Sequence, residues 1–231
     1  MKLRIITPFI LLSAFLAMTW SSCEVIEDVL SDEEIAQGLK EALRVGTDTA
    51  VFQGNKLNGY FGNNMIKIFL PPEGDAIVDV ISLIPGGQVL VDEVVLKLNR
   101  AAEEAAVEAT PIFLDAITNL TISDALVILN GNETAATEYL NTNTSLGIIS
   151  AYQPKIENAL TTVGAQQVWG ELTQLYNQIP LPLDPVNPDL AEYTTIKAKD
   201  GLFHLVGEEE KLIRANASHR VTDILKNVFG E

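Results

Sequence analysis

The chain has almost no cysteine and very little histidine, and this scarcity limits its chemistry. Cys23 is the one cysteine, and His204 and His219 are the two histidines. A single cysteine cannot form an internal disulfide, so packing has to stabilise the fold. A zinc site needs three or four ligands, and neither histidine stands at metal-ligand spacing from a second ligand. We therefore predict no metal site and no bound cofactor.

Basic residues are scarce as well. The 231 residues include 15 Lys or Arg against 31 Asp or Glu, which gives a formal net charge of −16. A surface with this excess of negative charge repels nucleic-acid phosphates and anionic lipid headgroups. We predict that the chain binds no nucleic acid and does not dock on a membrane through surface charge.

A long hydrophobic run is also missing. The most apolar stretch, from Ile5 to Trp20, has 16 residues and is interrupted at Thr7 and Pro8. A spanning helix needs about 20 apolar residues, so an uncleaved membrane span is the less favoured interpretation. A basic start, an apolar stretch and small residues before a cleavage point are typical of an export signal. We predict that residues 1–22 are a lipoprotein signal peptide.

Cys23 follows this signal directly. A lone cysteine is unusual in an exported protein unless it has a partner or a modification. Lipidation of Cys23 explains both its presence and its solitude, although Trp20 stands where bacterial lipoproteins usually carry leucine. Ordinary secretion, with Cys23 left free, is the alternative. Lipidation predicts that residues 23–30 form a short tether, whose seven residues after Cys23 reach at most about 25 Å.

The sequence from residue 31 to residue 231 predicts one all-α domain. Nearly every strong segment repeats its apolar residues with a period near 3.6, and no segment alternates as a strand does. Ser31 with Glu34 forms a capping box, and Thr121 with Asp124 is a second helix start. We expect about eight to ten helices in a compact bundle without significant sheet.

Further local signals set the expected boundaries. The strongest helix runs from Gln88 to about Thr110, and Pro111 opens a new turn or kinks it. We expect separate helices over 133–140 and 145–163, the second kinked near Pro154. Further expectations are an Asn187 cap with Pro188 at the first helical position, a bend at Asp200-Gly201, and a last helix that begins at Ser218.

Charged side chains supply the candidates for a site. Arg100, Glu103 and Asp124 are the candidate ligand-binding residues, although we expect Arg100 to pair with Glu104 and Asp124 to cap a helix. The acidic run 208–210 is interpreted as a solvated helix face in which Glu210 pairs with Arg214. The aromatic residues at 139, 152, 169, 176 and 193 are interpreted as core. No nucleophile and base form a recognisable motif, so we predict no catalytic residues.

Four segments together resemble one bacterial family, catalogued as domain of unknown function 4197. They are IKIFLP (66–71), LNRAAEEAA (98–106), TISDALVILNGNETAATEYL (121–140) and GLFHLVGEEEKLIRANASHRVTDILKNVFG (201–230). The resemblance covers almost the whole chain after the signal. It implies a lipoprotein or secreted protein of the bacterial cell envelope, on the periplasmic or the surface face, and it brings no established activity.

Three functions remain in competition. The leading hypothesis is a non-catalytic helical module that is held at the membrane by its lipid and binds a protein partner or a small ligand. A carrier of an apolar small molecule is the second, and it requires a continuous apolar cavity of roughly 300 Å³ or more. An unrecognised enzyme is the third, and it requires convergent titratable groups in a concave site.

Overall fold

The computed structural model describes residues 30–82, 85–178, 186–187, 189–216 and 226. Every regular element within these residues is a helix, which confirms the predicted all-α class. The α-helices are α1 (Asp32–Asn55), α2 (Asp75–Ser82), α3 (Gly87–Ala105), α4 (Ala109–Thr118), α5 (Ile122–Leu129), α6 (Ala135–Thr162), α7 (Ala165–Asn177) and α8 (Leu190–Ala215). Two short 3-10 helices, η1 (Pro72–Gly74) and η2 (Ala106–Glu108), complete the set.

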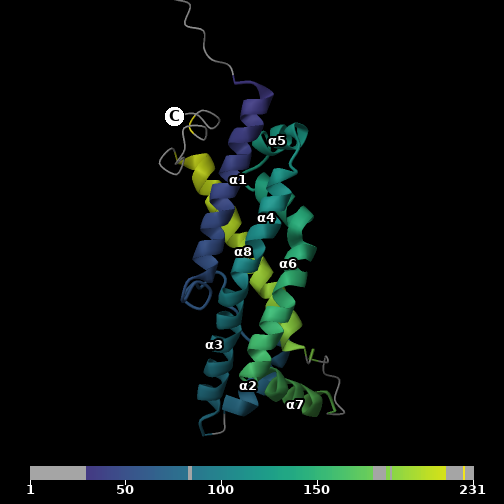
Figure 1. The fold of residues 1–231 in the computed structure, drawn as a ribbon. Coiled ribbons are helices and arrows are strands. Elements are labelled where there is room, and N and C mark those ends of the chain that lie inside the picture. Colours follow the sequence, from purple (N-terminus) through teal and green to yellow (C-terminus); the bar gives the residue numbers. More distant parts are fainter. Residues whose placement is uncertain (1–29, 83–84, 179–185, 188, 217–225, 227–231) are drawn as a thin grey trace, which may run out of the picture.

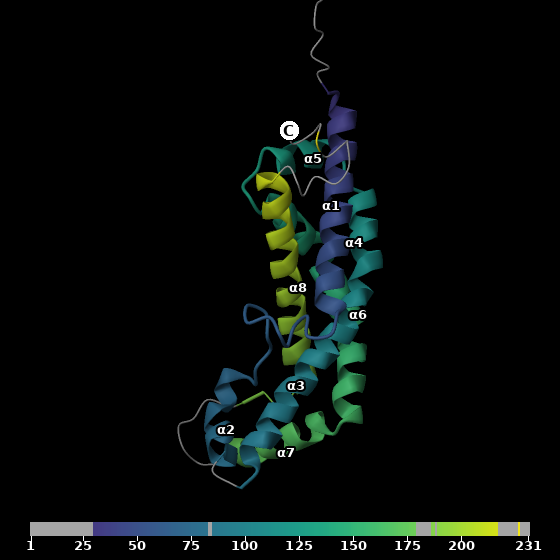
Figure 2. The same ribbon diagram turned by 90° about the vertical axis from the view of Figure 1, so that its left-hand side faces the viewer.

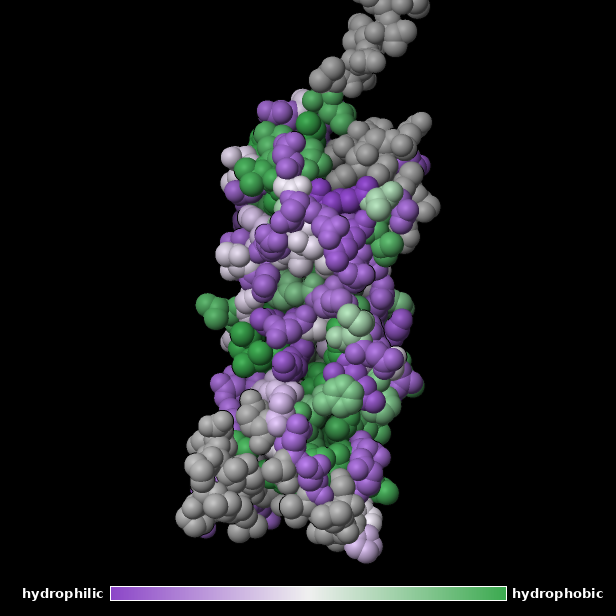
Figure 3. All heavy atoms as spheres, turned by 180° about the vertical axis from the view of Figure 1, so that it is seen from behind, coloured by the Kyte–Doolittle hydropathy of each residue, from purple (hydrophilic) through white to green (hydrophobic). Residues whose placement is uncertain are grey.

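The long helices form one elongated bundle (Figures 1 and 2). α8 packs against both α1 and α6, and α3 and α4 pack against α6. α5 lies at the end of the bundle where α1 begins, and α2 and α7 lie at the opposite end. Figure 3 shows the face on which α8 lies, with hydrophobic residues gathered in its lower half among hydrophilic ones.

One proline explains the break between α3 and α4. Pro111 has no N–H to donate to the carbonyl of Val107, so the helical ladder cannot continue regularly at this point. η2 occupies this position, and α3, η2 and α4 follow one another without a gap. The expected interruption at Pro111 is therefore confirmed.

Small residues bring these helices close together. Ala102, Ala105, Ala106 and Ala109 are completely buried along the α3–η2–α4 run. The hydroxyl of Tyr152 on α6 donates a hydrogen bond to the carbonyl of Ala106 at 3.2 Å. A buried phenol needs such a partner, and the Ala106 carbonyl, which also accepts from the N–H of Ala109, has a second lone pair for it.

Two expected boundaries were wrong. The residues expected to form two helices belong to one, α6, which continues through Pro154. Thr144, in the polar stretch that suggested a gap, is buried, and its hydroxyl bonds to the carbonyl of Leu140 at 2.6 Å. α8 is capped by Asp189, which accepts a hydrogen bond from the N–H of Glu192 at 2.8 Å, and not by Asn187.

α8 also passes through Asp200 and Gly201 as one helix, so the expected bend there is wrong. The predicted signal, the tether up to residue 29 and nearly all of the last helix lie outside the described residues. Among the described helices, no single one is long and apolar enough to cross a membrane. The run Gly87–Thr118 passes that test only together with α5, from which it is bent by 106°.

Candidate functional site

Arg100 and Glu103 form the first polar cluster, where the segment after α1 meets α3. The Glu103 side chain is buried and accepts hydrogen bonds from the N–H groups of Tyr60 and Phe61, each at 3.1 Å. Arg100 forms an ion pair with Glu103 and donates to the Asn58 side chain at 2.8 Å. A buried carboxylate is tolerated only when it is paired and hydrogen-bonded, as this one is.

Asn99, four residues before Glu103 on α3, also binds the main chain of the segment after α1. Its side-chain amide is completely buried, accepts from the N–H of Ile68 at 2.9 Å and donates to the carbonyl of Ile68 at 2.7 Å. One face of α3 thus fastens the irregular segment 56–71 to the bundle. Asn99 and Glu103 satisfy main-chain groups that would otherwise be buried without partners.

This cluster corrects the sequence interpretation of α3. Arg100 was expected to pair with Glu104, but Glu104 is exposed and the partner is Glu103. The candidate pair Arg100 and Glu103 does come together. Because both side chains bind groups of the protein itself, the pair stabilises the fold.

Asp124, the third candidate, lies elsewhere. Its carboxylate accepts from the Thr121 hydroxyl at 2.7 Å, and its N–H donates to that hydroxyl at 3.1 Å, so the pair caps α5. α5 lies beside the start of α1, whereas Asn55, at the end of α1, bonds to the Glu103 carbonyl at 2.9 Å. The three candidates do not converge on one site.

A second charged cluster joins α8 to α5 and α6. The carboxylate of Glu210 accepts from the N–H groups of Ala136 and Thr137 in the first turn of α6, at 3.0 and 2.8 Å. Arg214 bonds to Glu210 at 2.9 Å and donates to the carbonyl of Ile128, near the end of α5, also at 2.9 Å. A negative group thus lies at a helix start and a positive group at a helix end, as the helix dipoles favour.

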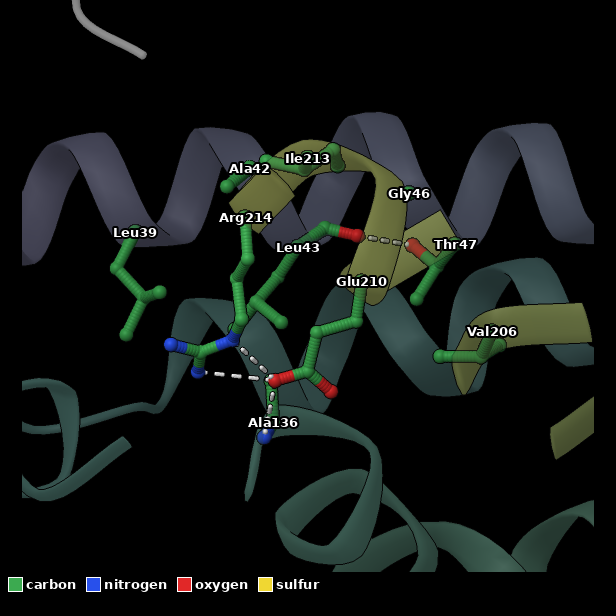
Figure 4. A pocket seen from close by; sticks show the side chains of 10 residues that line it. All are labelled: Leu39, Ala42, Leu43, Gly46, Thr47, Ala136, Val206, Glu210, Ile213 and Arg214. Carbon is green, nitrogen blue, oxygen red and sulfur yellow. Dashed lines mark hydrogen bonds and ion pairs between the residues drawn. The ribbon is translucent and has the colours of Figure 1, made fainter. Parts of the chain in front are cut away.

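Figure 4 shows this arrangement beside a small pocket between α1 and α8. The expected pairing of Glu210 with Arg214 is confirmed. The expectation of a solvated acidic face was wrong for Glu209 and Glu210, which are buried, whereas Glu208 is exposed and pairs with Lys211. Burial of Glu210 depends on α6, which begins about 75 residues earlier in the chain.

The apolar pockets are small. The pocket of Figure 4, lined mainly by Leu39, Leu43 and Val206, has a volume of about 30 Å³. A second, beside Trp169, has about 20 Å³. Each has room for about one water molecule and is far smaller than the cavity of a small-molecule carrier.

A larger groove lies between residues 65–72 and α8. We call it the cationic groove; its volume is about 380 Å³, and its walls are Met65, Ile66, Lys67, Ile68, Phe69, Leu70, Pro72, Tyr193, Lys197, Asp200, Gly201 and His204. His204 lines it, and so does Tyr193, which was expected in the core. His219 lies outside the described residues, as does the side chain of Tyr176. In the described part of the chain, no group of three or more His, Cys, Asp or Glu residues is arranged to hold a metal.

Comparison with known proteins places the chain in a family. A family model described as "Protein of unknown function (DUF4197)" matches residues 29–230. The chain belongs to the DUF4197 family. No curated protein and no solved structure matches it.

The four segments that resemble DUF4197 meet in pairs. Segment 66–71 is bound to segment 98–106 through Ile68 and Asn99. Segment 121–140 is bound to segment 201–230 through Glu210 and Arg214. The charged and amide side chains of these DUF4197 segments therefore hold the bundle together at two places.

Sequence reasoning missed the cationic groove. Residues 65–70 form neither a helix nor a strand, so no periodic pattern pointed to them. One signal was available, because no acidic residue occurs between Asp48 and Glu73 in a chain that carries 31 of them. Residues 65–72 of this stretch form one wall of the groove.

Proposed function

We propose that this chain is a lipid-anchored protein of the bacterial cell envelope and that its helical domain is a non-catalytic module that binds a partner. The observation that carries the proposal is the position of Cys23, the one cysteine, directly after a basic start and an apolar stretch. The family resemblance supports it, because it implies envelope lipoproteins or secreted proteins.

The buried charges support a non-catalytic role. A general acid or base has to reach a substrate, which requires a free lone pair or proton in a concave site. Glu103 and Glu210 instead bind main-chain N–H groups and an arginine. Both carboxylates are therefore committed to holding the fold.

The rival functions find less support. A carrier of apolar molecules requires a cavity about ten times larger than the pocket of about 30 Å³ between α1 and α8. An enzyme that uses Arg100, Glu103 and Asp124 together would need these residues in one cleft, but Asp124 caps α5 at the other end of α1.

A native mass spectrum of residues 24–231 from the natural host checks the carrier hypothesis. We expect a mass without a bound small molecule. A reproducible extra mass would favour the carrier over the interaction module.

The anchor is tested by the substitution Cys23→Ala in the full-length chain. We expect the unaltered protein to partition into the membrane fraction and the detergent phase, because acyl chains on one cysteine give stable attachment. The C23A protein should lose this behaviour. Equal partition of both proteins into the aqueous phase would contradict the anchor and favour simple secretion.

A further inference from the structure

Two lysines give the cationic groove a positive charge that no described residue neutralises through an ion pair. The Lys67 amine lies 4.1 Å from the centre of the Phe61 ring and 5.4 Å from that of Phe69, and the Lys197 amine lies 5.8 Å from that of Tyr193. Aromatic faces position an ammonium group without cancelling its charge. Neither lysine forms an ion pair with a described residue, and Asp200 pairs with Lys199 at 2.7 Å.

Other grooves of similar size differ in this respect. In the groove of about 560 Å³ between α1 and α4, Arg44 pairs with Glu41 and Asp48, and Lys40 donates to the Thr118 carbonyl. In the groove of about 310 Å³ between α3 and α6, Glu103 and Asn58 bind Arg100, and Lys97 shares the wall with the carboxylate of Glu104. The cationic groove differs in that its two lysines have no ion pair with a described residue and its one carboxylate, Asp200, pairs with Lys199.

The wall formed by residues 66–70 also exposes main-chain groups at one residue. Ile66 and Ile68 are buried and Phe69 is exposed. Both main-chain groups of Ile68 bond to Asn99, and the N–H of Lys67 donates to the Asn63 carbonyl at 2.8 Å, whereas the main-chain groups of Phe69 bond to no described residue. Phe69 therefore offers a partner one N–H and one carbonyl beside its exposed ring.

Apolar side chains complete the surface. Met65 is 73% exposed and Phe69 is 58% exposed at the groove. Lys67 lies between them in sequence, and its amine is 5.4 Å from the centre of the Phe69 ring, so a partner that covers this surface meets apolar side chains and a positive charge together. The two lysines and their exposed apolar neighbours form a locally positive surface in a chain of net charge −16, and such a surface is complementary to an acidic segment.

Resting on the proposed function of an interaction module, we propose that the cationic groove binds a segment of a partner protein that carries both acidic and apolar side chains.

A synthetic peptide tests the proposal on the full mature chain in detergent. The probe is a dye-labelled nine-residue peptide that alternates glutamate and valine, compared with peptides that carry glutamine or lysine in place of every glutamate. We expect saturable binding of the acidic peptide that weakens as salt is added, because salt screens exposed charges. Equal binding of the lysine peptide, or no saturable binding of the acidic one, would overturn the proposal.

Charge reversal locates the binding. The double variant K67E/K197E should bind the acidic peptide about tenfold or more weakly, because both attractions become repulsions. K56E, at an exposed lysine outside the groove, is the matched control and should bind unchanged. Circular dichroism verifies that each variant is folded. Unchanged affinity in the folded double variant would disprove the assignment.

Cross-linking in the host separates this site from the proposed function. A photoreactive residue at Phe69 should cross-link to an acidic segment of a protein, and K67E/K197E should abolish the product, whereas the same residue at Leu146, which is exposed on α6, should not. If proteins cross-link to the residue at Leu146 and none to the residue at Phe69, the domain still binds a partner but the cationic groove is not the binding site. Cross-links from Phe69 to lipid, or loss of binding to phosphatidylglycerol vesicles in K67E/K197E, would assign the groove to a membrane instead.

Discussion

Glu210 shows how a single side chain connects three helices. Its carboxylate binds two N–H groups of α6 and an arginine whose other bonds reach α5. Replacing it removes a charge from a buried pair and leaves the Arg214 guanidinium without its carboxylate. Removal of one partner from a buried pair is costly because the other charge stays buried.

We therefore predict that Glu210→Gln lowers the free energy of unfolding by about 2–4 kcal/mol. The matched control is Glu208→Gln, two residues earlier, where the side chain is exposed and pairs with Lys211. This change should stay within about 0.5 kcal/mol of the unaltered protein. Urea unfolding of both variants measures the difference, and equal stabilities would refute the capping role of Glu210.

Tyr60 gives a prediction for alkaline pH. Its phenol is completely buried and donates to the Ala198 carbonyl at 2.6 Å. Burial, with a further contribution from the negative charge of Glu103, raises the pKa of Tyr60 far above its ordinary value. The folded state thus keeps a proton that the unfolded state releases near pH 10, so the stability from this group is complete below pH 10 and declines above it.

Tyr60→Phe should therefore change the pH dependence as well as the stability. We expect a loss of about 1 kcal/mol at pH 7 from the missing hydrogen bond. Above pH 10, the stability of the variant should fall less steeply, by about 1.4 kcal/mol less per pH unit. Burial also raises the pKa of Tyr152, so some decline remains in the variant. Parallel curves for both proteins above pH 10 would contradict this account.

Local signals predicted several elements correctly. The capping boxes at Ser31 and Thr121 and the break before Pro111 depend on neighbours within about four residues, and the structure contains all three. The burial of Glu103 and Glu210 escaped prediction because their partners are 43 and 74 positions away. The continuity of α6 was not predicted because tertiary packing buries Thr144, so the helix continues through a polar stretch.

Gly201 illustrates the same lesson within α8. A Cβ atom at this position would lie 2.7 Å from Cε1 of Tyr60 and 3.1 Å from Cβ of Ile66. The glycine, which suggested a bend in sequence, instead lets the segment after α1 approach the helix. Its role is to leave space where the segment after α1 contacts α8.

This closeness predicts opposite effects of alanine at two helical glycines. Gly201→Ala should destabilise the protein by about 1–3 kcal/mol, because the added methyl group forces Tyr60 to move. Gly170→Ala in α7, where nothing lies within 4 Å of the added atom, should stabilise it by about 0.5–1 kcal/mol through helix propensity. Thermal unfolding compares the stabilities of the two variants. Stabilisation by both substitutions would show that the Tyr60 ring leaves room for a methyl group at position 201.

At the scale of the whole molecule, two sets of charged side chains stand out among the described residues. The first, Glu103 with Arg100 and Glu210 with Arg214, holds together segments of the bundle. The second is the pair of lysines in the cationic groove, which have no ion pair with a described residue. A stable scaffold with one distinctive surface fits a protein that binds a partner while held at a membrane.

The most direct test of this account is the mass of the N-terminal peptide of the protein extracted from its own host. We predict that the mature chain begins at Cys23 and that this residue carries a lipid of the mass of a diacylglyceryl group, with or without a further acyl chain. A chain that begins elsewhere, or a Cys23 with a free thiol, would contradict the anchored interaction module.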